Sequence, residues 1–419
     1  GGFNGHLSLD DHNGKITMDG SFVTSQAVPD FNLRVKVRDF RPYSLHLTKK
    51  YEDTDLSLNL TADFSGHSID DMRGSIHLDS LQVRTPDEAG NYFLPHLQIN
   101  ATQPQAHSPE KEIRITSPFL NGSIQGRYAY HTLLKSIEKV IRKHLPSLFP
   151  EAKSRKGAEP NNQFRFQFRM ENSDFLSKVL HVPFDLQMPA VLNGQFNDSL
   201  SQMHINGKHY ESGALLCETH PEELQFQVRA STLMKKGAMF NLSLLTRAKD
   251  DKLHSTLYWG NNTQLTYSGK IDAVASFSQD PRHKGLHTRV DIQPSQIILN
   301  DTTWHIHPAS VDIAKDSIEI HNFLFEHRDQ HLKIHGRLGK ADTDSCLVDL
   351  KNINLLYLMD MIQFHAVRFD GGISGKARLL HLLKDPVMEA RLDVKDFSLN
   401  QAVLGRADIL AADQIADDL

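Results

Sequence analysis

Pairs of histidines come nearer than any other residues of this sequence to the spacing of a metal site. The chain has 24 histidines. His305 and His307 are two residues apart on one face of an expected strand, and His331 and His335 share a face in the same way. Such pairs can bind zinc or copper. However, they occupy the polar positions of amphipathic strands, and no carboxylate or cysteine nearby completes a ligand set. The sequence therefore predicts surface histidines and no metal site.

One segment resembles a phosphate-binding loop. Gly371 to Lys376 has the sequence GGISGK, but Asp370 stands in place of the first glycine and Ala377 in place of the Ser or Thr. A strand pattern follows it where a phosphate loop needs a helix. The zinc-protease, nucleophile-elbow, EF-hand and dinucleotide-binding motifs are also missing from the sequence. We therefore expect that the chain is not an enzyme and has no cofactor.

Composition and charge exclude further classes. Net charge is −5 and mean hydropathy is −0.41, so no basic surface for nucleic acid is expected. No apolar run reaches the roughly 18 residues of a membrane-spanning helix, and no signal peptide is recognisable. The chain begins at Gly1 and ends at Leu419 after an unremarkable polar run, so we expect a fragment of a longer protein. Cys217 and Cys346 make no disulfide framework and are expected to be unpaired, although an oxidising compartment would permit a bond.

Alternation of apolar and polar residues is the dominant pattern. Phe164, Phe166 and Phe168, for example, alternate with charged or polar neighbours. Because successive strand residues point to opposite faces, this pattern predicts an antiparallel sheet with one apolar and one polar face. We expect an all-β fold, an elongated sheet curled into a groove (a β-taco), with two or three short helices. The candidate groove residues are Leu33, Val35, Val37, Leu56, Leu58, Leu60, Phe164, Phe166, Phe168, Leu224, Phe226, Val228, Ile318, Ile320, Leu332, Ile334, Ala390, Leu392 and Val394.

A short motif recurs at strand starts. An apolar residue, Asn or Asp, Gly, any residue and another apolar residue occur at 3–7, 120–124 and 369–373. The spacing is too irregular for a propeller or a solenoid. Asn13-Gly14, between two alternating runs, predicts a type I′ hairpin.

From Thr132 to Leu145 the apolar residues recur at helical spacing, which interrupts the strand pattern and predicts a helix. One side of this helix is an apolar stripe, and the opposite side carries Lys135, Lys139, Arg142 and Lys143. The stripe could pack on the sheet, which we favour, or the helix could lie on an anionic membrane surface. A second short helix is expected after a cap at Ser173 and Asp174, and a third at 355–362. Residues 151–162 are expected to be a flexible loop. The chain is thus read as β-sheet segment 1–130, helical insertion 131–185 and β-sheet segment 186–419, all in one continuous body.

An apolar sheet face of this length needs something to cover it. Acyl chains suit an open groove, since each buried methylene contributes about 0.8 kcal/mol, or roughly 12 kcal/mol for a sixteen-carbon chain. Two other uses stay open: a chaperone or scaffold that pairs outer-membrane β-strands along its sheet edges, and a β-sandwich array that binds glycans or acts as an adhesin.

The sequence resembles the family of the translocation and assembly module subunit TamB and its AsmA-like relatives from Gram-negative envelopes. The stretches that carry the resemblance are Ser295–Trp304, Ile318–Gly336, Phe369–Gly375, Asp385-Pro386, Glu389–Phe397, Leu404-Gly405, Leu120–Ile141 and Leu145–Leu148. The resemblance implies a periplasmic protein, anchored in the inner membrane, that carries phospholipid or another acyl lipid toward the outer membrane. It also implies a link to outer-membrane protein assembly and secretion with a BamA-like barrel partner. The sequence shows neither the N-terminal anchor nor a domain that would contact the barrel.

Overall fold

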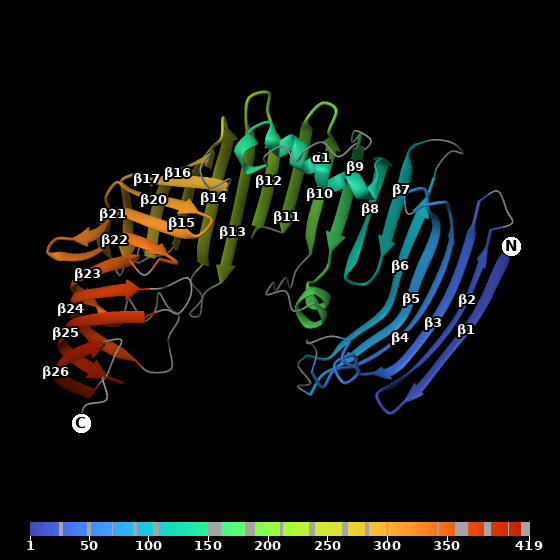
Figure 1. Ribbon diagram of the computed structural model, residues 1–419, viewed down its shortest axis with the longest axis horizontal. Coiled ribbons are helices and arrows are strands. Elements are labelled where there is room, and N and C mark those ends of the chain that lie inside the picture. Colours follow the sequence, from blue (N-terminus) through green and yellow to red (C-terminus); the bar gives the residue numbers. More distant parts are fainter. Residues whose placement is uncertain are drawn as a thin grey trace. The chain divides into compact units, whose positions relative to one another are not determined.

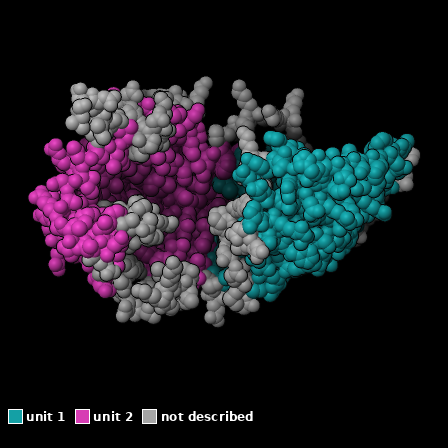
Figure 2. Space-filling model, turned by 90° about the horizontal axis from the view of Figure 1, so that it is seen from below, with its two compact units in different colours: residues 1–141, 155–220 teal, residues 142–154, 221–419 magenta. Residues whose placement is uncertain are grey.

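The computed structural model of the protein describes residues 1–24, 28–47, 52–68, 70–86, 90–103, 109–149, 161–180, 189–209, 213–233, 239–261, 267–280, 285–299, 301–341, 343–356, 368–380, 387–400 and 402–411. The chain divides into two compact units, coloured separately in Figure 2. Unit 1 comprises Gly1–Ile141 with Arg155–His220, and unit 2 comprises Arg142–Ser154 with Pro221–Leu419. The division into three segments, predicted from the sequence, stays a prediction.

Unit 1 is built from consecutive strands, each paired antiparallel with the next. Figure 1 shows them as one curved layer. Their bounds are β1 Gly2–Asp11, β2 Gly14–Val23, β3 Asp30–Phe40, β4 Asp55–Ser65, β5 Arg73–Arg84, β6 Tyr92–Thr102, β7 Lys111–Thr116, β8 Leu120–Arg127, β9 Gln163–Met170, β10 Ala190–Asn197, β11 Gln202–His209 and β12 Gly213–Thr219.

Unit 2 continues the same pattern with one fork. The first residues of β16 pair with β18 and its later residues with β17, and the two branches meet again at β21. The strands are β13 Leu224–Leu233, β14 Met239–Lys249, β15 Lys252–Asn261, β16 Tyr267–Asp280, β17 Gly285–Ile292, β18 Ser295–Leu299, β19 Thr302–Ile306, β20 Ala309–Ala314, β21 Ser317–His327, β22 Gln330–Gly339, β23 Ser345–Asn354, β24 Phe369–Leu380, β25 Val387–Leu399 and β26 Ala402–Ala411. The predicted all-β class and curled antiparallel sheet are confirmed.

The helical segments follow the prediction in place but not always in form. The helix α1 spans Tyr130–Arg142, and a 3₁₀ turn follows at Pro146–Leu148. At Phe175–Val179 the predicted helix is only one turn of π-helix, and the side chain of Asp174 does not cap it. Five residues are too few to gain from regular helical hydrogen bonding, so packing of the apolar side chains decides the local geometry. The expected loop at 151–162 lies outside the described residues except for its last two, and the expected helix at 355–362 except for its first two.

The first hairpin corrects the predicted turn by one residue. β1 ends at Asp11 and β2 begins at Gly14, so the turn is centred on His12 and Asn13, neither of which has a positive φ. A type I′ turn needs positive φ at both central positions, and the prediction of that type is therefore wrong. Gly14 is needed for another reason: its φ is +139°, and a Cβ there would lie 2.5 Å from the Cα of Phe40.

Candidate functional site: the apolar face of the sheet

The register of unit 1 aligns apolar residues into rows that cross the sheet from strand to strand. Residues that pair directly across an antiparallel sheet point to the same face, so a row describes a stripe of surface. Two neighbouring rows contain only apolar residues and glycine from β1 to β12. Row A consists of Gly5, Gly20, Leu33, Ala62, Ile76, Ile99, Ile115, Gly122, Phe168, Leu192, Gly207 and Leu215, and row B of Phe3, Phe22, Phe31, Phe64, Gly74, Ala101, Ile113, Ile124, Phe166, Gly194, Ile205 and Cys217.

Glycines in these rows make room for phenyl rings on the next strand. A Cβ on Gly194 would lie 2.7 Å from Cζ of Phe166, and a Cβ on Gly122 would lie 2.4 Å from Cδ1 of Phe168. The two rings are 6.1 Å apart between centroids. The two rings therefore lie over the glycine backbones, and this part of the sheet face is a shallow apolar surface. The recurring motif at 120–124 supplies one of these glycines, a role that the sequence alone did not reveal.

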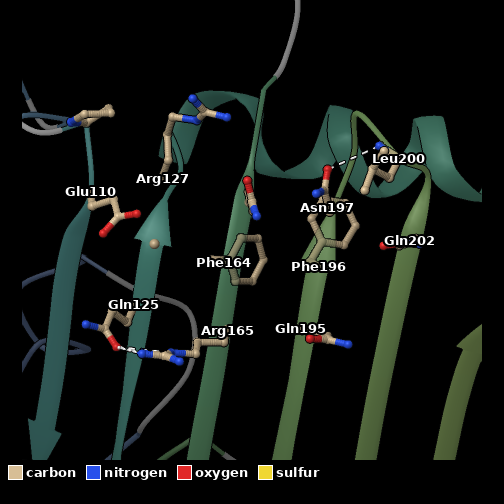
Figure 3. A pocket seen from close by; sticks show the side chains of 13 residues that line it. Glu110, Gln125, Arg127, Phe164, Arg165, Gln195, Phe196, Asn197, Leu200 and Gln202 are labelled. Atoms are coloured by element: carbon tan, nitrogen blue, oxygen red, sulfur yellow. Dashed lines mark hydrogen bonds between the residues drawn. The ribbon is translucent and has the colours of Figure 1, made fainter.

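Among the described residues, side chains from outside the rows cover both ends of this face. At one end Phe175 of the π-turn stacks on Phe119 with centroids 4.8 Å apart, over a buried cluster that includes Leu81 and Leu94. Burial in the same place raises the pKa of Tyr92 to about 12. At the opposite strand ends, which α1 crosses in Figure 3, Phe196 is buried. Rows A and B lie between these two covered ends, and most of their large side chains are half-buried.

The groove residues predicted from the sequence are spread over both units, and their burial differs from one position to the next. In unit 1, Leu33 belongs to row A, Phe166 to row B and Phe168 to row A, and all three are half-buried. Val37, Leu224, Ala390 and Val394 are buried. The other predicted residues are half-buried: Val35, Leu56, Leu58, Leu60, Phe164, Phe226, Val228, Ile318, Ile320, Leu332, Ile334 and Leu392. None of the predicted groove residues is exposed.

The opposite face of unit 1 carries polar side chains. Figure 3 shows a shallow depression there, lined by Gln125, Arg165 and Gln195 among others. Arg165 donates a hydrogen bond from Nη2 to Oε1 of Gln125 at 2.7 Å. The lining residues include no serine, cysteine or histidine, so this depression holds no nucleophile with a base.

Helix α1 packs on the sheet through polar side chains, which the sequence did not predict. Its fully buried residues are Thr132, Ser136 and Val140. Ser136 donates from Oγ to Oδ2 of Asp198 at 2.7 Å, and Asp198 also accepts from the backbone N–H of Asn162 at 2.9 Å. The side-chain amide of Asn162 donates to the hydroxyls of both Thr132 and Ser136. We call Thr132, Ser136, Asn162 and Asp198 the anchor network.

This packing turns part of the apolar stripe outward. Leu134 is 81% exposed and Ile137 is 37% exposed, whereas packing on the sheet was expected for both. That expectation is therefore wrong for these two residues. The physical reason is the anchor network, because buried polar groups must keep their hydrogen-bond partners and so set the rotation of the helix.

A second contact holds the start of α1. Asp70, from the segment between β4 and β5, accepts a hydrogen bond from the backbone N–H of Tyr130 at 2.6 Å. A carboxylate is favourable at the positive end of a helix. Lys111 places Nζ 4.1 Å from the ring centroid of Tyr130 and 4.5 Å from that of Tyr128, and burial lowers the pKa of Lys111.

In unit 2 the apolar face begins with a similar row. Row C crosses the sheet through Leu224, Ala248, Leu253, Ala275, Val290, Val311, Ile320, Gly336, Cys346, Leu379 and Met388. Elsewhere on this face Trp259 is half-buried, and its ring lies over Gly269, where a Cβ would be 2.3 Å from Cζ2. The surface of unit 2 is hollowed in Figure 2.

Farther along unit 2 the apolar side chains close into a core of their own. Trp304 is 2% exposed and stacks on Phe325 with centroids 4.7 Å apart. The fully buried members of this core are Trp304, Leu350, Ile353, Leu355, Ile373 and Val394, and the predicted groove residues Leu332 and Leu392 pack against it. We call this the Trp304 core. Of the predicted groove residues, Val394 therefore lies inside the Trp304 core, and Leu332 and Leu392 lie against it.

Two of the four candidate histidines lie beside carboxylates. His307 lies 2.7 Å from Glu326 through Nε2, and His331 lies 3.5 Å from Asp349. Within the described ranges, no three metal-binding side chains are grouped so that they could hold an ion. Gly371 to Lys376 lies inside strand β24, as predicted, which leaves no phosphate loop. Both cysteines are free, in β12 and β23.

Comparisons with protein families, with curated proteins and with solved structures find no match for this chain. No helix in the described part of the chain combines the length and the apolarity needed to cross a bilayer.

Proposed function

We propose that the apolar face of the sheet binds the acyl chains of lipids and passes them along its rows. The observation that carries this proposal is the pair of rows A and B, which stay apolar or glycine through every strand from β1 to β12. Their large side chains are mostly half-buried, and such a surface is favourable for a bound hydrocarbon chain.

An acyl chain fits this surface better than a compact ligand would. Rows A and B contain no polar residue that would hold a ligand at one position. Burial of each methylene of an acyl chain therefore contributes about 0.8 kcal/mol to binding wherever the acyl chain lies along a row. The phenyl rings that lie over Gly122 and Gly194 offer a hydrocarbon chain apolar contact along the rows. The cellular setting belongs to the same proposal: a periplasmic protein, anchored in the inner membrane, that moves phospholipid toward the outer membrane. Cooperation with a BamA-like barrel protein stays a prediction, as do the strand-scaffold and adhesin alternatives.

One pair of variants tests the face directly. Phe166→Asp places a charge in row B, and Gln167→Asp places the same charge on the opposite face of the same strand. Uptake of a fluorescent phospholipid by the detergent-free protein should fall strongly in Phe166→Asp and stay near wild type in Gln167→Asp. Equal uptake in the two variants, with both folded by circular dichroism, would refute binding at row B.

The two tryptophans of the chain provide a second test in unit 2. Trp259 is half-buried on the apolar face, and Trp304 lies inside the closed core. Phospholipids with brominated acyl chains quench tryptophan on contact. They should quench the Trp304→Phe variant, which keeps Trp259, and leave the Trp259→Phe variant almost unquenched. If no lipid is extracted from the purified protein and neither variant is quenched, the lipid proposal fails.

A further inference from the structure

The stretch of chain that follows α1, residues 143–148, is attached to the turn between β14 and β15. The backbone N–H of Asp251 in that turn donates to the carbonyl oxygen of His144 at 3.0 Å. The carboxylate of Asp251 accepts from the backbone N–H of Ser147 at 2.7 Å and from its hydroxyl at 3.0 Å. The side-chain amide of Gln279 on β16 donates to the carbonyl oxygen of Ser147. All of these residues belong to unit 2. We call residues 143–148 the linker segment.

The β14–β15 turn keeps an aspartate where a glycine would be easier to accommodate. Its two central residues are Asp250, with φ +51°, and Asp251, with φ +57°. Turns with positive φ at both central positions favour glycine at the second one, because a side chain there strains the backbone. A glycine at 251 would relieve this strain but would lose both hydrogen bonds to Ser147. Asp251 therefore favours attachment of the linker segment over an unstrained turn.

His144 is the buried side chain at the centre of this attachment. It is 2% exposed, and Leu145 beside it is 5% exposed. The imidazole is hydrogen-bonded to the backbone of Glu222, while its Nε2 is buried and has no hydrogen-bond partner among the described residues. A neutral imidazole needs only one donor bond, but the protonated ring has two N–H groups. A proton on Nε2 would therefore be buried without an acceptor.

The charged groups around His144 do not supply that acceptor. They are Lys143 on the linker segment, Asp250 and Asp251 in the β14–β15 turn, and Glu222 and Glu223 just before β13. Ser147 occupies the carboxylate of Asp251, and Lys249 pairs with the carboxylate of Glu222 at 2.6 Å. Burial lowers the pKa of His144 and Lys143 acts in the same direction, while the bond to Glu222 and the charges of Asp250 and Glu223 offset only part of this effect.

We propose that the linker segment is a pH-sensitive attachment, which leaves the β14–β15 turn when His144 takes up a proton. In the released segment the imidazole is in water and binds a proton with the ordinary pKa of about 6.5, whereas in the attached segment protonation is disfavoured. Attachment is therefore complete above about pH 6.5 and weakens as the pH falls below it. Because these residues directly follow α1, the switch decides whether the helix is continued by an ordered or a free stretch of chain. The proposal does not depend on whether the sheet carries lipid.

The test is hydrogen exchange of the full chain at pH 7.5 and pH 5.5, with each rate divided by its intrinsic rate at that pH. In wild type, protection of the amides at 145–149 and at Asp251 should fall several-fold, and at most about tenfold, between the two pH values. His144→Gln keeps a donor for the Glu222 carbonyl but does not titrate, so its protection should be the same at both. His335→Gln changes an exposed histidine of β22 and is the matched control, which should respond to pH like wild type.

A further variant separates the hydrogen bonds of the attachment from its titration. Ordinary carboxylates stay ionised over this pH range, so the response reports on a histidine. Ser147→Ala should lower protection by a similar factor at both pH values and leave the pH dependence in place. Should His144→Gln fail to fold, His144→Leu fills the same buried site without a titrating group. Wild-type protection that changes less than twofold, or an equal fall in wild type and in the His144 variant, would overturn the proposal.

Discussion

Removal of the Asp198 carboxylate is the sharpest test of how α1 is held. The side chain is 0% exposed and accepts from Ser136 at 2.7 Å and from the backbone of Asn162 at 2.9 Å. Hydrogen bonds to a charged group contribute about 1.5 to 3 kcal/mol each, and Asp198→Ala removes two and leaves both donors unpaired. Removing a buried charge offsets part of this loss. We expect a net loss of about 3 kcal/mol in the local stability of α1.

Hydrogen exchange of the amides in Tyr130–Arg142 measures this loss. A change of about 3 kcal/mol corresponds to exchange about 100-fold faster in Asp198→Ala. Ser199→Ala is the matched control: its hydroxyl lies 3.4 Å from the other carboxylate oxygen of Asp198, too far to contribute much. Exchange less than tenfold faster in Asp198→Ala, or the same as in Ser199→Ala, would show that Asp198 does not anchor the helix.

Three further outcomes follow from local geometry and burial. Gly375→Ala should lower the free energy of unfolding by about 2 kcal/mol in a urea titration, because φ is +138° and a Cβ would lie 2.2 Å from a carbonyl of the next strand; Gly20→Ala, whose nearest atom is 3.6 Å away, should be close to neutral. The Cys346 thiol is 1% exposed and burial raises its pKa, so Ellman's reagent should react with it far more slowly in the native protein than in urea, and equally fast reaction would contradict its burial. The hydroxyl of Ser68 and neighbouring amides hold the pKa of Asp71 well below its ordinary value of 3.8. The ionised Asp71 side chain therefore stabilises the fold above about pH 4, and this stabilisation is lost as the pH falls further. The difference in unfolding free energy between wild type and Asp71→Asn should shrink between about pH 6 and pH 3, and a constant difference would count against this assignment.

Strand positions and strand faces were predictable because their signal is local. The alternation of Phe164, Phe166 and Phe168 with polar residues needs only the period of an extended chain, and these residues do lie on one face of β9. The strand assignment of Gly371 to Lys376 was recoverable for the same reason: Ala377 and the following pattern suit a strand. The position of α1 was also predictable, since helical spacing is a local property.

The row alignment could not be read from the sequence. Whether Gly194 faces Phe166 depends on the register between β9 and β10, which hydrogen bonds across the whole ladder determine. The same holds for the closure of the Trp304 core, where side chains from strands far apart in the chain meet only once the sheet has curved. Alternation alone therefore overestimated how much of the apolar face of unit 2 stays open.

Helix α1 illustrates the division between the two levels. By itself the sequence determined that the segment is helical, that it carries lysines and that it has an apolar stripe. Which side faces the sheet was decided by Asn162 and Asp198, which the sequence places after the helix and which only the fold brings beneath it. Buried hydrogen bonds are directional and costly to leave unmade, whereas apolar burial is not directional. The polar anchor network therefore set the rotation of the helix and left Leu134 exposed.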